Sequence, residues 1–119
     1  KRVMRAMENE HVDIIAHPSG RKLNERPPYE MHFDALLQAA KETRTVLEIN
    51  ALPNRLDLDP SHIRSCIRRG ILLSIGTDAH DVAGLAHYEL GISMARRGWA
   101  QKKDVINTYS WKEMLKLLK

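Results

Sequence analysis

The residues best suited to chemistry follow short apolar runs of the chain. Asp78 and His80 come directly after the run 71–76, and His17 directly follows the run 12–16. Carboxylates and imidazoles suit Zn, Mn and Fe. Because Asp78 and His80 are two residues apart on an extended segment, their side chains would point to one face and could reach the same metal ion or adjacent ions. The alternative is a turn in which Asp78 only caps backbone amides.

A third run, 45–50, ends in Glu48 and Asn50. All three runs are short, β-branched or apolar, and followed by a helical pattern, which predicts consecutive βα units of a parallel sheet. In such sheets chemistry collects at the carboxyl ends of the strands. We therefore expect the polar residues of the strand ends to converge: His17, Glu48, Asn50, Asp78 and His80.

Glu48 has three roles open to it, because a carboxylate can ligate a metal, act as a base or orient a ligand from behind. Within an extended run it points to the same side as Asn50, so we predict that both line the pocket without ligating a metal. Two loops on the same side carry Arg21, Arg26 and Arg55. These arginines could clamp a phosphate group, although structural salt bridges would explain them almost as well.

Helical spacing of apolar residues appears between and after the strands. It predicts a helix through Phe33 and Ala40, one from Pro60 to a stop at Gly70, and one through Leu85 that ends at Gly98. Asp59 is a suitable N-cap for the second of these helices. Ser110 and Glu113 have capping-box spacing before a last helix. Three apolar residues of that helix are expected to face the protein body: Met114, Leu115 and Leu118.

Length and composition limit the possible classes. The 119 residues are too few for a complete eight-unit barrel of about 250 residues. The net charge of +4 is compatible with a phosphate-rich partner, but an ordinary solvated surface would give the same mild excess. The only cysteine, Cys66, excludes an internal disulfide and falls at core-facing helical spacing. No membrane span or signal peptide is visible, which predicts a cytoplasmic location without membrane contact.

Four segments together are more specific than any one motif, and in order and spacing they resemble the C-terminal half of the PHP (polymerase and histidinol phosphatase) domain. The resemblance is to the PHP domain at the end of bacterial and archaeal family X DNA polymerases, and it covers nearly the whole chain. The segments are Asp13–Arg21, Leu47–Ala51 with Arg55–Leu58, Gly76–His80, and Ala95–Trp99.

This resemblance implies an α/β fold, a distorted (β/α)7 TIM-like barrel. Residues 1–119 would be one partial domain of it, without the N-terminal strands and the polymerase domains. It also implies a cluster of two or three Mn or Zn ions that activates water for phosphoester hydrolysis, giving a 3′-5′ exonuclease for DNA 3′ ends in DNA repair. His17, Asp78 and His80 match metal-ligand and catalytic positions of the family.

The resemblance further implies that the remaining ligands come from earlier strands. We therefore expect this chain alone to be weak or inactive, and its open strand edges could pair with a second copy. Two other functions stay open. A stand-alone small-molecule phosphatase resembling histidinol phosphatase would hydrolyse phosphomonoesters and ignore DNA. A non-catalytic module that binds DNA or stabilises a polymerase would be insensitive to chelators.

Overall fold

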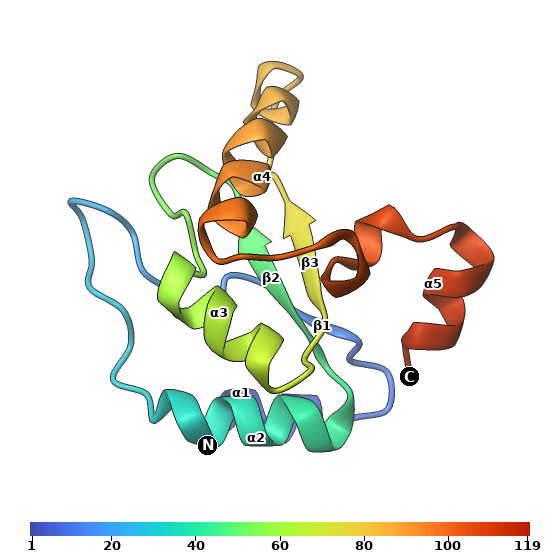
Figure 1. Ribbon diagram of the computed structural model, residues 1–119. Coiled ribbons are helices and arrows are strands. Elements are labelled where there is room, and N and C mark those ends of the chain that lie inside the picture. Colours follow the sequence, from blue (N-terminus) through green and yellow to red (C-terminus); the bar gives the residue numbers. More distant parts are fainter.

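A parallel three-stranded sheet lies at the centre of the protein (Figure 1). The computed structural model describes all residues, 1–119. Strands β1 (Ile14–Ile15), β2 (Val46–Asn50) and β3 (Leu73–Gly76) lie in the order β1-β2-β3. Leu47 of β2 pairs with Ile15 on one side and with Leu73 on the other. The predicted parallel α/β arrangement is confirmed, whereas the barrel stays a prediction, because this sheet is open at β1 and β3.

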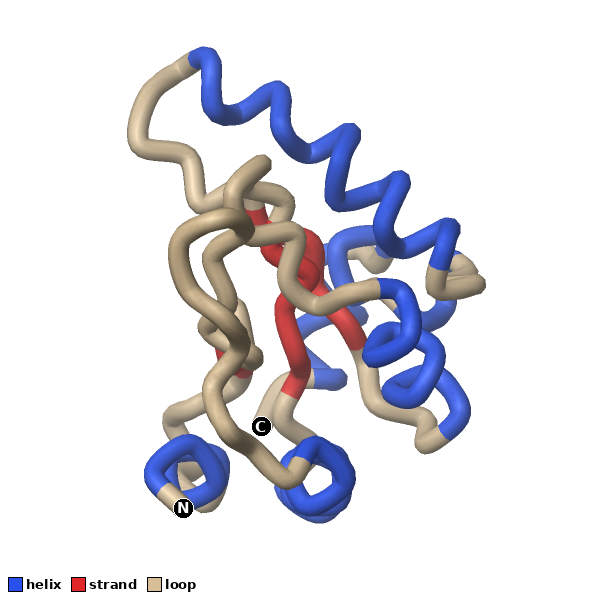
Figure 2. Tube along the Cα trace, turned by 90° about the vertical axis from the view of Figure 1, so that its left-hand side faces the viewer, coloured by secondary structure: helices blue, strands red, loops and turns tan.

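Five α-helices and three short 3-10 helices accompany the strands. The α-helices are α1 (Arg2–Met7), α2 (Phe33–Thr43), α3 (Pro60–Arg68), α4 (Tyr88–Arg97) and α5 (Trp111–Leu117). The 3-10 helices are η1 (Ala83–His87), η2 (Lys102–Asp104) and η3 (Ile106–Thr108). Figure 2 shows two helices end-on at the lower end, α1 and α2, while α4 extends to the opposite end of the strands. No helix combines the length and apolarity that crossing a membrane requires.

Helix α3 begins and ends where the sequence predicts. The Asp59 carboxylate accepts hydrogen bonds from the amides of Ser61 at 2.8 Å and His62 at 3.0 Å, which makes it the N-cap. Burial alone would raise the pKa of Asp59, but the hydrogen bonds from His62 and Ser61 outweigh burial and lower the pKa below its ordinary value. Gly70 follows the helix with a φ of 70°, a conformation that glycine adopts without strain.

The hydrophobic core lies between the sheet and helices α2, α3 and α4. It combines residues of the strands with residues of the helices that pack on them: Leu47, Ile49, Leu73, Leu36, Leu37, Ile63, Cys66 and Met94. Cys66 is buried, as its helical spacing predicted, and burial raises the pKa of its thiol to about 12. The thiol is therefore protonated and acts as a packing group.

Two glycines allow α4 to approach its neighbours closely. A Cβ atom at Gly91 would lie 2.5 Å from Cγ2 of Ile75 and 3.0 Å from Cβ of Ala51. A Cβ atom at Gly98 would overlap Ile63 of α3. The helix ends at Gly98 as predicted, but Gly98 has a φ of −83° and the left-handed residue is Trp99, with a φ of 68°. Gly98 is thus needed for packing more than for its backbone conformation.

Three elements differ from the sequence-based prediction. Leu85, predicted in the helix that ends at Gly98, lies in the 3-10 helix η1, and α4 begins only at Tyr88. Strand β1 has two residues instead of the five of the run 12–16, because it is an edge strand and the chain turns at His17, whose φ is 33°. The prediction that Leu115 faces the protein body is wrong, since its side chain is 49% exposed. Helix α5 lies at the periphery beside η3 (Figure 1), so the body covers only part of its apolar face.

Candidate functional site at the strand ends

Glu48 and Asn50 connect the ends of all three strands. Glu48 Oε2 accepts a hydrogen bond from the backbone amide of His17 at 2.7 Å and another from Asn50 Nδ2 at 3.1 Å. Asn50 Nδ2 also donates to Asp78 Oδ2 at 3.3 Å. One side-chain amide therefore bridges two carboxylates, one on β2 and one just beyond β3. The structure thus brings together four of the five residues that the strand-end pattern placed here.

Gly76 makes room for this network. A Cβ atom at this last residue of β3 would overlap Oε1 of Glu48. Glu48 pairs with Ser74 across the strands, so its side chain runs toward the carboxyl end of β3 over Gly76. The absence of a side chain at Gly76 lets the Glu48 carboxylate reach the end of β1.

Asp78 is held in place by a cation as well as by Asn50. Its carboxylate Oδ2 lies 3.3 Å from Arg55 Nε, and the Arg55 side chain is only 13% exposed. Nε and Nη1 of Arg55 are buried and form no aligned hydrogen bond, so the contact is electrostatic in character. Asp78 adopts a φ of 52°, which turns the chain sharply after β3. Arg55 thus compensates the charge of Asp78 through Nε, and its Nη1 is buried without a hydrogen-bond partner.

The two histidines of the prediction differ in their contacts. His80 Nδ1 lies 2.6 Å from the backbone carbonyl oxygen of Asp78, so the ring is oriented by its own turn and Nε2 has no partner. His17 joins the network through its backbone amide, and its side chain forms no hydrogen bond. No three His, Cys, Asp or Glu side chains lie close enough together to hold a metal ion. The donor types at His17, Asp78 and His80 suit Mn or Zn, but these residues alone do not form a coordination group.

The guanidinium groups of Arg21 and Arg26 donate hydrogen bonds to backbone carbonyl oxygens. Arg21 donates from Nε to the carbonyl oxygen of Arg55 at 2.9 Å and from Nη2 to that of Leu56. Arg26 donates from Nε and Nη2 to the carbonyl oxygen of Gly20 at 3.1 and 2.7 Å. Both guanidinium groups fasten the loops on the site side, but mainly through backbone carbonyls and not through the salt bridges that the sequence left open; Arg21 Nη1 alone lies near a carboxylate, 4.0 Å from Asp59 Oδ2.

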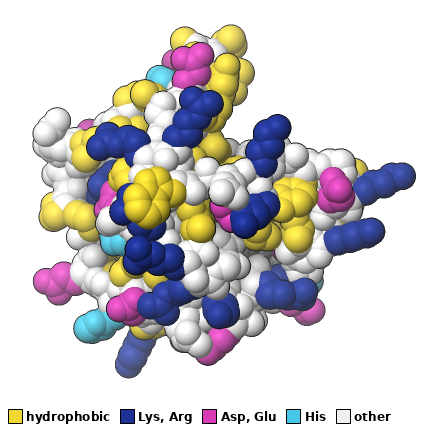
Figure 3. All heavy atoms as spheres, in the orientation of Figure 1, with side chains coloured by type: hydrophobic (Ala, Val, Ile, Leu, Met, Phe, Trp, Pro, Cys, Tyr) yellow, Lys and Arg dark blue, Asp and Glu magenta, His cyan; other side chains and the backbone are white.

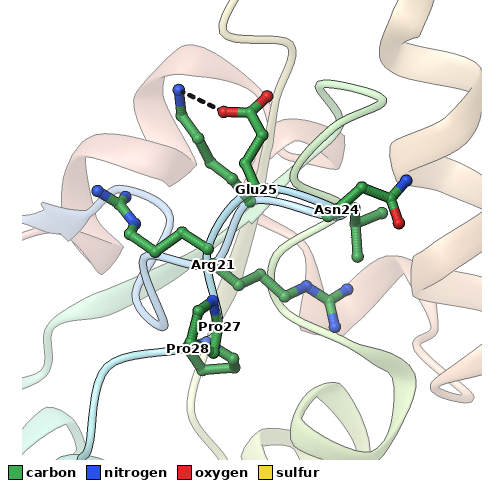
Figure 4. A pocket seen from close by; sticks show the side chains of 8 residues that line it. Arg21, Asn24, Glu25, Pro27 and Pro28 are labelled. Carbon is green, nitrogen blue, oxygen red and sulfur yellow. Dashed lines mark ion pairs between the residues drawn. The ribbon is translucent and has the colours of Figure 1, made fainter.

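The same loop forms an open pocket of about 420 Å³ (Figure 4). Its lining is nearly all polar or proline: Arg21, Lys22, Leu23, Asn24, Glu25, Arg26, Pro27 and Pro28. The dashed line in Figure 4 is the ion pair between Lys22 and Glu25, 3.4 Å long. Glu25 pairs with Lys22, and the guanidinium groups of Arg21 and Arg26 keep their charge but already donate to backbone carbonyls, so the pocket has few free hydrogen-bond donors for a phosphate group.

Asp57 is a buried residue of this region that the sequence analysis did not single out. Its side chain is fully buried, and Oδ2 accepts hydrogen bonds from the amides of Ser19 and Gly20, both at 3.0 Å. Burial raises the pKa of Asp57 despite these bonds and the nearby Arg21 charge. Asp57 thus fixes the loop that follows His17. A carboxylate between two leucines, Leu56 and Leu58, was the only signal in the sequence.

No family model matches the chain. It is 44% identical over all 119 residues to the DNA polymerase/3′-5′ exonuclease PolX of Bacillus subtilis, of which it spans 21%. It is 28% identical over 86 residues, 67% of the chain, to a probable phosphatase of Clostridium acetobutylicum, of which it spans 33%. Over 91% of the chain it is 25% identical to a probable phosphatase of a Thermoanaerobacter species, of which it spans 44%.

The chain therefore spans less than half the length of each of these relatives. Its match to PolX covers the whole chain and lies in the C-terminal 21% of that protein. The motifs that carry the resemblance, and the strand ends on which they lie, fall within this match. The chain is thus homologous to the C-terminal part of the PHP-domain protein PolX, as its motifs predicted.

Proposed function

We propose that this chain forms one wall of a phosphoesterase site that removes nucleotides from DNA 3′ ends, as part of a repair enzyme with polymerase domains. The observation that carries the proposal is the network of Glu48, Asn50 and Asp78 at the strand ends, in a chain 44% identical to a protein named polymerase and 3′-5′ exonuclease. The probable phosphatases among the relatives support phosphoester hydrolysis as the general chemistry.

The residues of this wall supply groups that phosphodiester hydrolysis needs. Attack by water on phosphorus needs a positioned nucleophile and compensation of the charge that develops on the phosphoryl oxygens. Arg55, which pairs with Asp78 at the strand ends, is the cation of this wall that lies nearest to the place where that charge would develop. Asn50 and Glu48 hold Asp78 and the His17 backbone in position, so in this proposal they are positioning residues.

We further propose that His17, Asp78 and His80 ligate Mn or Zn together with side chains from outside this chain. Their chemistry suits these ions, and Nε2 of His80 has no partner, but three converging ligands are not present here. A divalent ion in such a site would make water more acidic and polarise a phosphoryl oxygen. The 119-residue chain alone is accordingly expected to be weak or inactive.

The test is a chimera in which this chain replaces the matching C-terminal 21% of Bacillus subtilis PolX. With Mn and a 3′-labelled oligonucleotide, we expect release of 3′ nucleotides that stops on chelation. Asp78→Asn should lower the rate at least 100-fold, because the proposed ligand loses its charge. His11→Ala, at an exposed histidine outside the network, is the matched control and should leave the rate unchanged.

Full exonuclease activity of the Asp78→Asn chimera would contradict the proposal. Hydrolysis of phosphomonoesters without action on DNA would favour the alternative of a small-molecule phosphatase, which the similarity to probable phosphatases motivates. DNA binding that survives chelation, with no hydrolysis of either substrate, would favour a non-catalytic module.

A further inference from the structure

Trp99 is an exposed aromatic residue in an unusual backbone conformation. Its side chain is 65% exposed, and its φ of 68° places a bulky residue in the left-handed region. This conformation is costly for such a residue and persists only where the surrounding structure holds it. The preceding Gly98 packs directly on Ile63, which fixes the position of Trp99 relative to α3. A large apolar ring is therefore held rigidly at the surface, outside the core.

One face of the Trp99 ring is covered by Arg64. The Arg64 guanidinium carbon lies 3.5 Å from the ring centroid, which is stacking distance. Nη2 of Arg64 also contacts the carbonyl oxygen of Arg97 at 3.4 Å, and Nε is buried without a partner. The guanidinium plane is thus anchored, and the exposed part of the ring remains for a second planar group.

The surface around Trp99 is positively charged. Figure 3 shows dark-blue side chains over the face formed by α3 and α4, next to exposed hydrophobic groups. Arg64 stacks on the ring, and five further cations lie on α3 or close to Trp99 in the sequence: Arg68, Arg96, Arg97, Lys102 and Lys103. None of the six has a carboxylate within 4.0 Å, whereas Arg69 of the same helix is paired with Asp34. Asp104 is the acidic residue nearest to Trp99 in the sequence, but its carboxylate caps η2 and pairs with none of these cations.

We propose that Trp99 and Arg64 form a stacking platform for a base of single-stranded nucleic acid, with Arg68, Arg96, Arg97, Lys102 and Lys103 receiving its phosphates. A rigid aromatic ring among unpaired cations matches the way proteins bind single strands, with bases on π-faces and phosphates on cations. In a duplex the faces of the bases are stacked on one another, so a duplex could contact the cations of this surface but could not stack a base on Trp99. The proposal rests on the proposed function only in naming the strand as DNA that leads to a 3′ end.

The platform is linked to the strand-end site through α3. That helix begins at Pro60, directly after the loop that carries Arg55 and Asp57, and Gly98 lies against its first turns at Pro60 and Ile63. A strand bound at Trp99 would therefore lie on the layer that also borders the proposed hydrolytic site.

The test is the affinity of the 119-residue chain for a fluorescent oligo-dT strand, measured by anisotropy in chelator at low salt. A stacked base contributes enough that Trp99→Ala should weaken binding about tenfold, while Trp99→Tyr should restore most of it. Trp111→Ala is the matched control, because Trp111 is 66% exposed on α5, and it should change the affinity less than twofold. Arg96→Ala with Arg97→Ala should reduce the salt dependence of binding by about two phosphate contacts.

A second measurement uses tryptophan fluorescence in a Trp111→Phe background, where Trp99 is the only indole. Saturating oligo-dT should quench it, and duplex DNA should not. Equal effects of Trp99→Ala and Trp111→Ala, no quenching, or equal quenching by heparin would overturn the platform. Since both measurements run in chelator, their outcome is independent of hydrolysis, so a failure of the chimera assay leaves them interpretable.

Discussion

At the scale of single residues, the loops of this site are held mainly by hydrogen bonds of carboxylates and amides. The Asn50 side-chain amide donates hydrogen bonds to Glu48 and Asp78. The Asp57 carboxylate accepts hydrogen bonds from the backbone amides of Ser19 and Gly20. The contacts of Asn50 with Asp78 and of Asp57 with Ser19 and Gly20 join segments that are far apart in the sequence. The loops at the strand ends are therefore held by polar contacts that are expensive to remove, because buried donors without acceptors lose their hydration.

Asp57→Ala should destabilise the fold by about 3 kcal/mol, because it leaves two buried amides without an acceptor. Urea unfolding measures this difference. Asp57→Asn keeps an acceptor oxygen and is the matched control, with an expected loss of at most half as much. Equal stability of the alanine variant and the native chain would mean that the amides find water when the carboxylate is removed.

The titration of Asp57 gives a second expectation, with a definite sign. Burial raises its pKa in the folded state above the ordinary value of 3.8, so the folded chain binds the proton more tightly than the unfolded chain. The contribution of Asp57 to stability is therefore largest below pH 3.8 and declines as pH rises through the folded-state pKa. The unfolding free energy of the native chain minus that of Asp57→Asn should fall over this range. A difference that grew with pH would contradict the raised pKa.

At the scale of elements, some helix-determining residues act within their own helix, whereas others act through contact with a neighbouring element. The caps Asp59 and Ser110 act within their own segments, which is why they are visible in the sequence. Glycines such as Gly91 act through another element, since the atoms that need the space belong to Ile75 and Ala51. Such positions look like weak helix residues until the neighbouring strand is known.

Gly91→Ala should destabilise the chain although it favours the helix. Alanine gains about 1 kcal/mol in helix propensity, whereas a Cβ atom 2.5 Å from Ile75 forces α4 away from the sheet at a cost of about 1 to 3 kcal/mol. Thermal or urea unfolding decides which effect is larger. Ser93→Ala, on the exposed side of the same helix, should change stability by less than about 0.5 kcal/mol. A stabilised Gly91→Ala would mean that α4 shifts without cost.

The sequence predicted the elements well because apolar periodicity and caps are local. It also placed Glu48 and Asn50 on one side of β2, since alternate residues of a strand share a face. It could not predict Asp57, whose partners Ser19 and Gly20 come from another loop, nor that Arg21 and Arg26 bind backbone carbonyls. The exposure of Leu115 was missed for a similar reason, because helical spacing does not show whether anything covers the apolar face.

At the scale of the whole molecule, two of the exposed apolar surfaces bear on how the chain could associate. Ile14 of β1 is 39% exposed, and β1 pairs only with β2. The second surface is the end of the molecule around η1 and α4, where Val82, Leu85 and Tyr88 are 85%, 58% and 50% exposed. The chain spans 21% of PolX, so in a longer protein other segments could cover these surfaces. In the isolated chain both surfaces are open to water.

The open edge of β1 should make the isolated chain associate with itself. An edge strand offers unpaired amides and carbonyls to a second copy, and Ile14 adds an apolar contact beside them. Sedimentation velocity should show a fraction of dimer that rises with concentration, and Ile14→Lys should lower that fraction several-fold, because a charge on an edge strand opposes pairing. Val82→Lys removes apolar surface at the far end and separates the two surfaces. If Val82→Lys abolishes association and Ile14→Lys does not, the contact is made by η1 and α4 and the β1 edge is protected by its shortness.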